Sequence, residues 1–173
     1  MRNLLSPRML LTTWPSQWLG GALAASFWPC VEVQRNVLRS DHANFDVLIG
    51  SSWGGAVAAA LLAEGAWTGP TLLMCPALNK LSRHGGDDSI TQPIVQGLKA
   101  LPDSQKAQCL LIHGDADETV PLDDSRRLAD ETGIELVVIP GGSHGMSAVA
   151  RDGRLLRFAE RVVQASQNYT SRL

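Results

Sequence analysis

The 173-residue sequence predicts an α/β fold in three layers, a doubly wound and mostly parallel sheet of about five or six strands with helices on both faces. Two observations lead to this prediction. Short apolar runs alternate with helical patterns from residue 46 to residue 163, and loops rich in glycine or carboxylates follow several of the runs. The chain is also long enough to bury roughly two thirds of its unfolded surface without disulfides or metals.

Four apolar runs, each too short for a core helix, predict the buried strands. They span residues 46–50, 71–75, 109–113 and 135–139, and a glycine or proline ends or follows each of them. The intervening segments 56–64, 94–101 and 122–132 predict helices, residues 79–92 a polar loop, and apolar spacing over 155–163 a C-terminal helix. The helix over 122–132 has acidic residues in its first turn and a glycine just past its end, so both of its termini are well marked.

The first forty residues allow more than one interpretation. Residues 8–13 suit a strand, and residues 17–27 suit a short helix that ends before Pro29, because a proline disfavours helical geometry in the residue that precedes it. Residues 30–38 alternate like a strand but also repeat their apolar positions at helical spacing. We favour the helix there.

One motif carries chemistry and organises the rest of the chain. Gly50-Ser51-Ser52-Trp53-Gly54 fits the pattern G-x-S-x-G, with Ser52 at a sharp turn between a strand and a helix. Such a turn exposes the serine oxygen, and the start of the helix together with the Trp53 N–H favours developing negative charge. The plainer interpretation is that Ser51 and Ser52 only cap a helix. Of the two, Ser51 is the lesser candidate because it occupies the variable position of the motif.

A serine nucleophile needs a base to take its proton and a carboxylate to orient that base. A loop crowded with carboxylates, including Asp115 and Asp117, follows the strand 109–113, and a glycine-rich loop with His144 follows the strand 135–139. The order Ser, Asp, His and the strand-end positions predict a catalytic triad. Asp115 is the alternative acid.

The remaining histidines fit the chemistry less well. We interpret His113 as a strand-end residue that supports its loop. His42 and His84 lie in polar segments without an evident partner, so we expect them to be structural or solvent-facing.

Taken together, Gly50-Ser51-Ser52-Trp53-Gly54-Gly55, the run His113 to Pro121 and Gly142-Ser143-His144 resemble the α/β-hydrolase superfamily, over roughly residues 30 to 165. The resemblance is to its small, cap-less members related to dienelactone hydrolase. It implies a minimal α/β-hydrolase fold and a serine hydrolase that cleaves esters or thioesters through an acyl-enzyme. In that family the loop G-x-x-D-x-x-V-P carries the catalytic acid, which here is Asp117. The implied site is therefore Ser52, His144 and Asp117, with the Trp53 N–H in the oxyanion hole.

The chain departs from this family upstream of the elbow. Members normally have a strand ending in His-Gly, whose loop gives the second oxyanion N–H, and no His-Gly precedes the elbow here. Either residues 13–16 supply that loop in altered form, or that strand is missing. We therefore separate an atypical segment 1–28, which the sheet could include, from a hydrolase domain spanning 29–173. The alternative function is a catalytically weak hydrolase-fold protein that binds a ligand or partner.

The composition limits the classes of molecule that this protein is expected to bind. The formal net charge is −2, the pI is about 6.0 and no run of Lys or Arg occurs, so we expect no nucleic acid. No stretch approaches the ~18 uncharged apolar residues of a membrane span. About thirty residues separate Cys75 from Cys109, too few for a lid domain, which suggests an open site for a small-molecule ester or thioester. The chemistry requires no metal or organic cofactor.

The cysteines indicate the cellular compartment in which the protein is expected. The sequence has an odd number of cysteines, Cys30, Cys75 and Cys109, and two of them lie in apolar runs. We therefore expect reduced thiols, as is usual in the cytoplasm, and a cytoplasmic protein. The first thirty-one residues contain no Asp or Glu, which leaves organellar targeting as the alternative.

Overall fold

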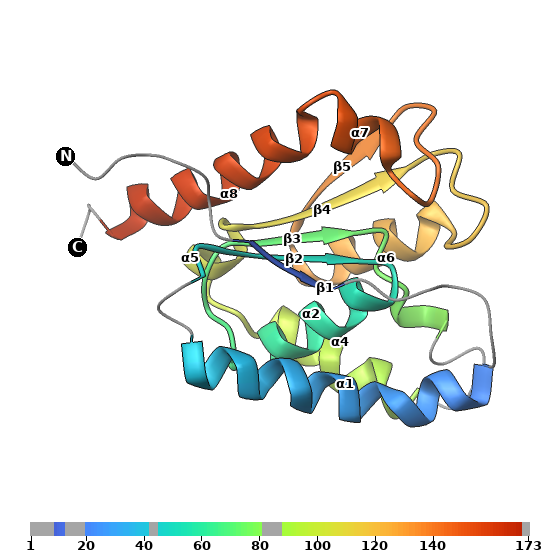
Figure 1. The fold of residues 1–173 in the computed structure, drawn as a ribbon, viewed down its shortest axis with the longest axis vertical. Helices are drawn as coiled ribbons and strands as arrows, with labels where there is room; N and C mark the ends of the chain where they lie inside the picture. The colour runs from blue at the N-terminus through green and yellow to red at the C-terminus, as the bar shows by residue number, and fades with distance from the viewer. Residues whose placement is uncertain (1–8, 13–19, 42–44, 81–87, 171–173) are drawn as a thin grey trace.

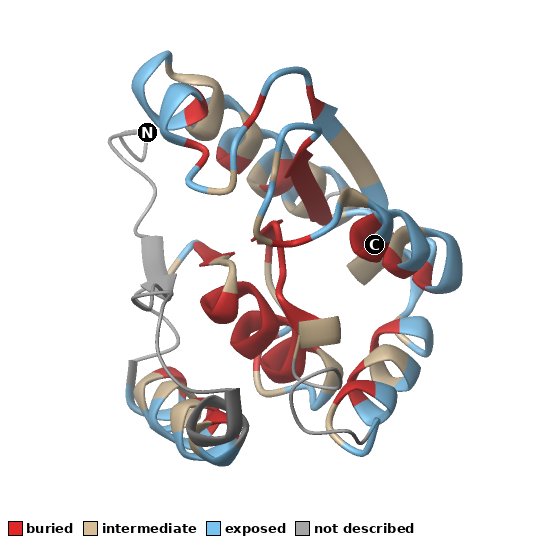
Figure 2. Ribbon diagram, turned by 90° about the vertical axis from the view of Figure 1, so that its right-hand side faces the viewer, coloured by how far each residue is buried: buried red, intermediate tan, exposed pale blue. Residues whose placement is uncertain are grey.

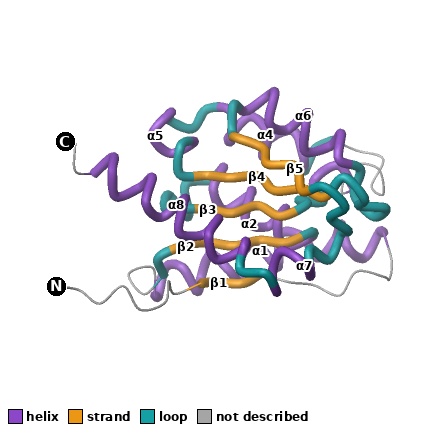
Figure 3. The backbone as a smooth tube through the Cα atoms, turned by 90° about the horizontal axis from the view of Figure 1, so that it is seen from above, coloured by secondary structure: helices purple, strands orange, loops and turns teal. Residues whose placement is uncertain are grey.

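A sheet of five parallel strands forms the centre of the computed structural model, which describes residues 9–12, 20–41, 45–80 and 88–170. The strands lie side by side in chain order, as Figure 3 shows. They are β1 (Met9–Thr12), β2 (Val47–Ser51), β3 (Thr71–Met74), β4 (Cys109–Gly114) and β5 (Glu135–Ile139). The predicted α/β class and parallel sheet are confirmed, and the strand boundaries differ from the predicted ones by one residue at most among the described residues.

The helices cover both faces of the sheet (Figure 1). Because each strand adds to the same side of the sheet, right-handed crossovers bring the connecting helices to one face. These helices are α1 (Gly20–Asp41), α2 (Trp53–Ala63), α4 (Thr91–Lys99) and α6 (Leu122–Thr132). The C-terminal helix α8 (Arg154–Thr170) lies against β2, β3 and β4 on the opposite face. Two further short helices are α5 (Asp103–Lys106) and α7 (Ser147–Arg151).

The core is split by the sheet into two layers, as the period of two along each strand requires. On β2, the side chain of Leu48 belongs to the layer under α1 and α2, whereas Val47 and Ile49 belong to the layer under α8. Helix α2 is buried along nearly its whole length, which explains its Ala-rich sequence, since small side chains let it lie between the sheet and two other helices (Figure 2).

The predicted end of a helix before Pro29 is wrong. Helix α1 runs without a break through Pro29, and it confirms the helical interpretation of residues 30–38. Proline removes one intrahelical hydrogen bond and leaves a carbonyl four residues earlier without its donor. Here Pro29 and Ala25 are both exposed, so water can satisfy that carbonyl. The helix therefore crosses the boundary that we place after residue 28, and β1 pairs with β2 as part of the sheet.

Other differences concern element ends. Helix α2 begins three residues earlier than predicted, directly at Trp53, and α4 begins at Thr91 within the segment we expected to be a loop. Within the described ranges, no helix combines the length and the apolar character needed to cross a membrane.

Candidate active site

The turn between β2 and α2 holds Ser52 in an unusual backbone conformation, with φ 54° and ψ −118°. The Ser52 N–H donates to the Met74 carbonyl at 2.8 Å, so the turn is tied to the end of β3. A Cβ atom on Gly50 would lie 2.4 Å from the Gly54 carbonyl oxygen, and one on Gly55 would lie 3.0 Å from the Cα of Pro76. Glycine is thus required by close backbone approach on both sides of the serine.

His144 lies within hydrogen-bonding distance of this serine, although 92 residues separate them in the chain. Its Nε2 is 2.8 Å from Ser52 Oγ, and its Nδ1 is 2.8 Å from Asp117 Oδ2. Since the carboxylate only accepts, Nδ1 carries a proton and Nε2 of the neutral ring accepts from the serine hydroxyl. The three residues predicted as a triad are therefore brought together in the order that proton transfer needs.

Asp117 is held by its own loop as well as by the histidine. Its Oδ1 accepts from the backbone N–H groups of Thr119, at 2.8 Å, and Val120, at 2.9 Å. Burial by itself would raise the pKa of this carboxyl. The hydrogen bonds from Val120, His144 and Thr119 outweigh that effect and lower the pKa of Asp117 below its usual range, so the carboxylate stays ionised.

The loops that carry the acid and the base touch each other through glycine. A Cβ on Gly114 would lie 1.9 Å from the Gly142 carbonyl oxygen, so no other residue fits there without moving the backbone. Asp115, the alternative acid, lies in a different place: its Oδ1 accepts from the Gly141 N–H at 2.6 Å. It braces the contact between the loops and does not face His144.

Trp53 is the first residue of α2, so helix geometry offers its backbone N–H no acceptor within the helix. Its indole ring is buried and meets the Phe27 ring of α1 edge-on, with centroids 5.5 Å apart. The helix α1 thereby fixes the side chain that follows the serine. Residues 13–16, which are the candidates for the second oxyanion donor, lie outside the described residues, as do His42 and His84.

His113 supports the acid loop, in agreement with its interpretation as a strand-end residue. It is fully buried, with Nδ1 2.7 Å from Ser125 Oγ and Nε2 3.0 Å from the Val120 carbonyl. Sequence reasoning missed that Cys75, after β3, lies beside the same loop. Cys75, His113 and Asp117 form one group of possible metal ligands among the described residues, with ligand atoms within 4.8 Å of one another.

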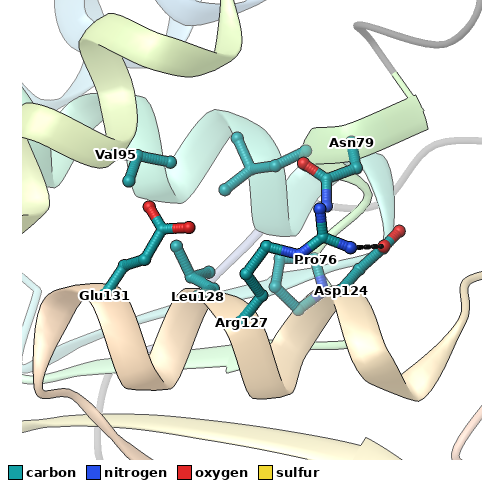
Figure 4. A pocket seen from close by; sticks show the side chains of 8 residues that line it. Pro76, Asn79, Val95, Asp124, Arg127, Leu128 and Glu131 are labelled. Carbon is teal, nitrogen blue, oxygen red and sulfur yellow. Dashed lines mark ion pairs between the residues drawn. The ribbon is translucent and has the colours of Figure 1, made fainter.

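A small pocket opens elsewhere on the molecule, between α4, α6 and the segment after β3 (Figure 4). Asp124 and Arg127 form an ion pair at its rim, at 3.7 Å. Leu78 and Leu128 supply apolar walls. Neither Ser52 nor its two partners line this pocket, so it is separate from the triad residues.

Comparison with known proteins identifies the fold. The sequence matches no protein-family model and no curated protein sequence. The structure resembles an α/β serine hydrolase homologue of Coxiella burnetii at 20% identity and a TM-score of 0.52, covering 88% of this chain and 62% of that one. It also resembles a meta-cleavage product hydrolase of Pseudomonas fluorescens at 16% identity and a TM-score of 0.57, covering 91% and 75% of the two chains.

A third neighbour is the esterase domain of a Rhodothermus marinus protein, at 15% identity and a TM-score of 0.56, with 83% of this chain and 71% of that one covered. This chain spans only 62% of the length of the Coxiella burnetii homologue. The five-stranded sheet, the elbow after β2 and these likenesses show that the chain has the α/β-hydrolase fold.

Proposed function

We propose that this protein is a serine hydrolase that cleaves ester or thioester bonds through an acyl-enzyme formed on Ser52. The single observation that carries the proposal is the unbroken line of hydrogen bonds from Ser52 Oγ through His144 to Asp117, with both distances at 2.8 Å. A serine that merely capped α2 would bond the helix backbone, and the Ser52 side chain makes no such bond.

In the acylation step, Ser52 Oγ attacks the acyl carbon while His144 Nε2 takes the hydroxyl proton. The carbonyl oxygen becomes an oxyanion, which the Trp53 N–H and the N-terminus of α2 stabilise. His144 then gives its proton to the departing alcohol or thiol as the bond to the acyl carbon breaks. Asp117 keeps the imidazole oriented and stabilises the imidazolium throughout.

In the deacylation step, water replaces the alcohol. His144 Nε2 takes a proton from the water as its oxygen attacks the acyl carbon, and returns that proton to Ser52 Oγ when the ester to the serine breaks. The products are a carboxylic acid and the free enzyme. No metal or organic cofactor takes part in either step.

The substrate class follows from the chemistry and the surroundings of the site. Acyl transfer to a serine suits a small-molecule ester or thioester, and the described part of the β3 to β4 connection consists of short helices, which supports an open site of the dienelactone-hydrolase kind. The thiols of Cys30, Cys75 and Cys109 are all unpaired, which supports a reducing, cytoplasmic setting.

The decisive experiment is labelling with a fluorophosphonate probe, which reacts with activated serines. The wild type should label and should hydrolyse p-nitrophenyl acetate, and Ser52→Ala should lose labelling and at least about 10⁴-fold of the turnover. Its thermal midpoint should change little, because the hydroxyl is placed for chemistry and contributes no bond to the helix.

Ser51→Ala is the matched control and should retain labelling and turnover. Equal labelling of the wild type and Ser52→Ala would move the nucleophile to Ser51 or elsewhere. A folded wild type that neither labels nor turns over would favour the other candidate function, a hydrolase-fold protein that binds a ligand or partner.

A further inference from the structure

His113 links helix α6 to the loop that carries Asp117. It is fully buried and shares the face of β4 with Leu111, in the layer of the core that also contains Leu128 of α6. Its Nδ1 lies 2.7 Å from Ser125 Oγ, near the start of α6. Its Nε2 lies 3.0 Å from the Val120 carbonyl oxygen. Both ring nitrogens therefore have a partner, and the ring is fixed from two sides.

These two partners determine which nitrogen of His113 carries the proton. A carbonyl oxygen can only accept, so Nε2 carries the proton and donates to Val120. In the neutral ring Nδ1 is then an acceptor, so the Ser125 hydroxyl donates to it. Ser125 thus favours the tautomer of His113 that presents a donor to Val120.

Val120 connects His113 to the acid of the triad. Its carbonyl accepts from His113, and its own N–H donates to Asp117 Oδ1 at 2.9 Å. Val120 is fully buried, so its carbonyl needs a donor from the protein. Burial raises the pKa of Asp117, and among the interactions that lower this pKa the hydrogen bond from Val120 is the largest. The orientation of one buried residue therefore affects how firmly the ionised acid is held.

His113 also lies beside the other oxygen of the acid. Its Nε2 is 3.3 Å from Asp117 Oδ2, the oxygen that lies 2.8 Å from His144 Nδ1. The side chains of His113 and Asp117 are both fully buried, so solvent screens the interaction between them only weakly. The positive end of the Nε2–H bond therefore favours an ionised Asp117 in the orientation that faces His144.

We propose that His113 is a positioning residue for the reaction, whose Nε2–H, oriented by Ser125, holds Val120 and the Asp117 carboxylate in the geometry that His144 needs. This inference rests on the proposed function for its kinetic consequence. Without the imidazole, the buried Val120 carbonyl loses its donor, and the loop has to shift to reach another one. The Val120 N–H then moves away from Asp117 Oδ1.

The first test needs only the wild-type protein and an assignment. In nitrogen-edited NMR spectra of the histidine rings, His113 should carry its proton on Nε2 and leave Nδ1 bare, with the signals assigned by their absence in His113→Leu. A proton on Nδ1 alone would turn a lone pair toward the Val120 carbonyl and would overturn the inference.

The second test removes the donor and then restores it. His113→Leu combined with Ser125→Ala makes the buried pair apolar and leaves no hydroxyl without an acceptor. We expect kcat for p-nitrophenyl acetate to fall about tenfold in this double variant with KM unchanged, since a hydrogen bond that orders the charged acid is lost. His113→Gln keeps an N–H donor of similar reach and should recover most of that loss.

Thr132→Val is the matched control for a general loss of stability. Thr132 is buried near the other end of α6, and its hydroxyl donates to the Leu128 carbonyl at 2.6 Å. The substitution removes a buried side-chain hydrogen bond from the same helix but none from the loop of Asp117. It should lower the thermal midpoint and keep wild-type kcat. A tenfold loss of kcat in this control as well would overturn the inference.

A readout independent of turnover is the low-field proton resonance of His144 Nδ1–H, assigned by its absence in His144→Ala. It should move or broaden in the double variant and stay in place in His113→Gln and Thr132→Val, even for a wild type that hydrolyses nothing. A wild type without labelling or turnover would refute the proposed function, whereas this resonance and the tautomer of His113 would still decide the inference.

Wild-type kcat with an unmoved resonance in the double variant would overturn the inference, and so would a loss in His113→Gln equal to that in the double variant. If the double variant does not fold, His113→Gln decides. Near-wild-type kcat and an unmoved resonance then support the role of the Nε2–H donor, and a tenfold loss refutes it.

Discussion

Ser52, the proposed nucleophile, has a strained backbone. Its φ of 54° costs free energy, and the close contacts of Gly50 and Gly55 leave the turn no easy way to relax. The strain is held by bonds from the Ser52 backbone to Met74 and Ala77, which come from the adjoining strand end. As a result, the hydroxyl is presented to His144 before any substrate arrives.

The pH dependence of turnover is a prediction at this scale. His144 must be neutral to accept the serine proton, so protonation of its ring in acid stops the reaction. Since the pKa of Asp117 is lowered, the carboxylate stays ionised and does not contribute a limb of its own near neutral pH. We therefore expect kcat/KM to rise through one acidic to neutral limb in a pH-rate profile. A flat profile from about pH 5 to 9, with chemistry rate-limiting, would exclude a histidine base.

The sequence contains enough information to predict that Ser52, Asp117 and His144 lie close together, because each follows a strand run and parallel strands end at one edge of a sheet. It does not contain enough to find Cys75. That residue looks like the last position of an apolar run, and its place beside His113 and Asp117 depends on a positive φ that no local pattern marks.

At the scale of elements, helix α1 shows the limit of local rules. The low helix propensity of proline predicts that the helix ends before Pro29. Burial of Phe27, Val31 and Leu38 on one face nevertheless stabilises a single long helix. Tertiary burial outweighs one lost hydrogen bond when the proline faces solvent. The alternation of strands and helices from β2 to β5 is easier to predict. In those segments the conformation that the local sequence favours is also the one that packs in the fold.

Replacing that proline tests this explanation. Pro29→Ala restores a backbone donor in the middle of α1, and the ring it removes is exposed. We expect the free energy of unfolding to rise by about 1–3 kcal/mol, with a higher thermal midpoint by circular dichroism. A lower midpoint would mean that the ring has a packing role that its exposure does not reveal.

A second prediction concerns the contact between the loop of Asp117 and the loop of His144, which touch at Gly114 and Gly142. Gly114→Ala would place a Cβ 1.9 Å from a backbone oxygen, so the loops must separate. We expect a loss of roughly 1–3 kcal/mol in the free energy of unfolding, measured with urea, and a marked fall in kcat.

The control for this change is Gly145→Ala. A Cβ there has no neighbour within 4 Å, and the residue has no positive φ. It should alter the free energy of unfolding by less than about 0.5 kcal/mol. Equal effects of the two substitutions would show that loop contact is unimportant.

For the whole molecule, the buried carboxylate links stability to pH. The folded pKa of Asp117 is lower than its unfolded value, so its ionised form stabilises the fold above the unfolded pKa of about 3.9. That contribution is lost as pH falls through the folded pKa. We expect the difference in free energy of unfolding between wild type and Asp117→Asn to be constant at neutral pH and to shrink below about pH 4.

Urea denaturation between pH 3 and 7 measures this difference. Asp123→Asn is the control, because the Asp123 side chain is 77% exposed and pairs with Arg126 at the surface. A difference that grows as the solution becomes more acidic would contradict the assignment of an ionised, stabilising Asp117.

The order of the strands also divides the protein into two halves that could be exchanged. The part up to β3 carries Ser52, whereas β4, β5 and their loops carry Asp117, His144 and the contacts between them in one continuous stretch. A recombination boundary at α5 would cut between these halves and leave each one internally intact. Chimaeras made there need to restore the β3 to β4 pairing, the packing of α8 on β2 and β3 and of α6 on α4, and the contact of Ser52 with His144.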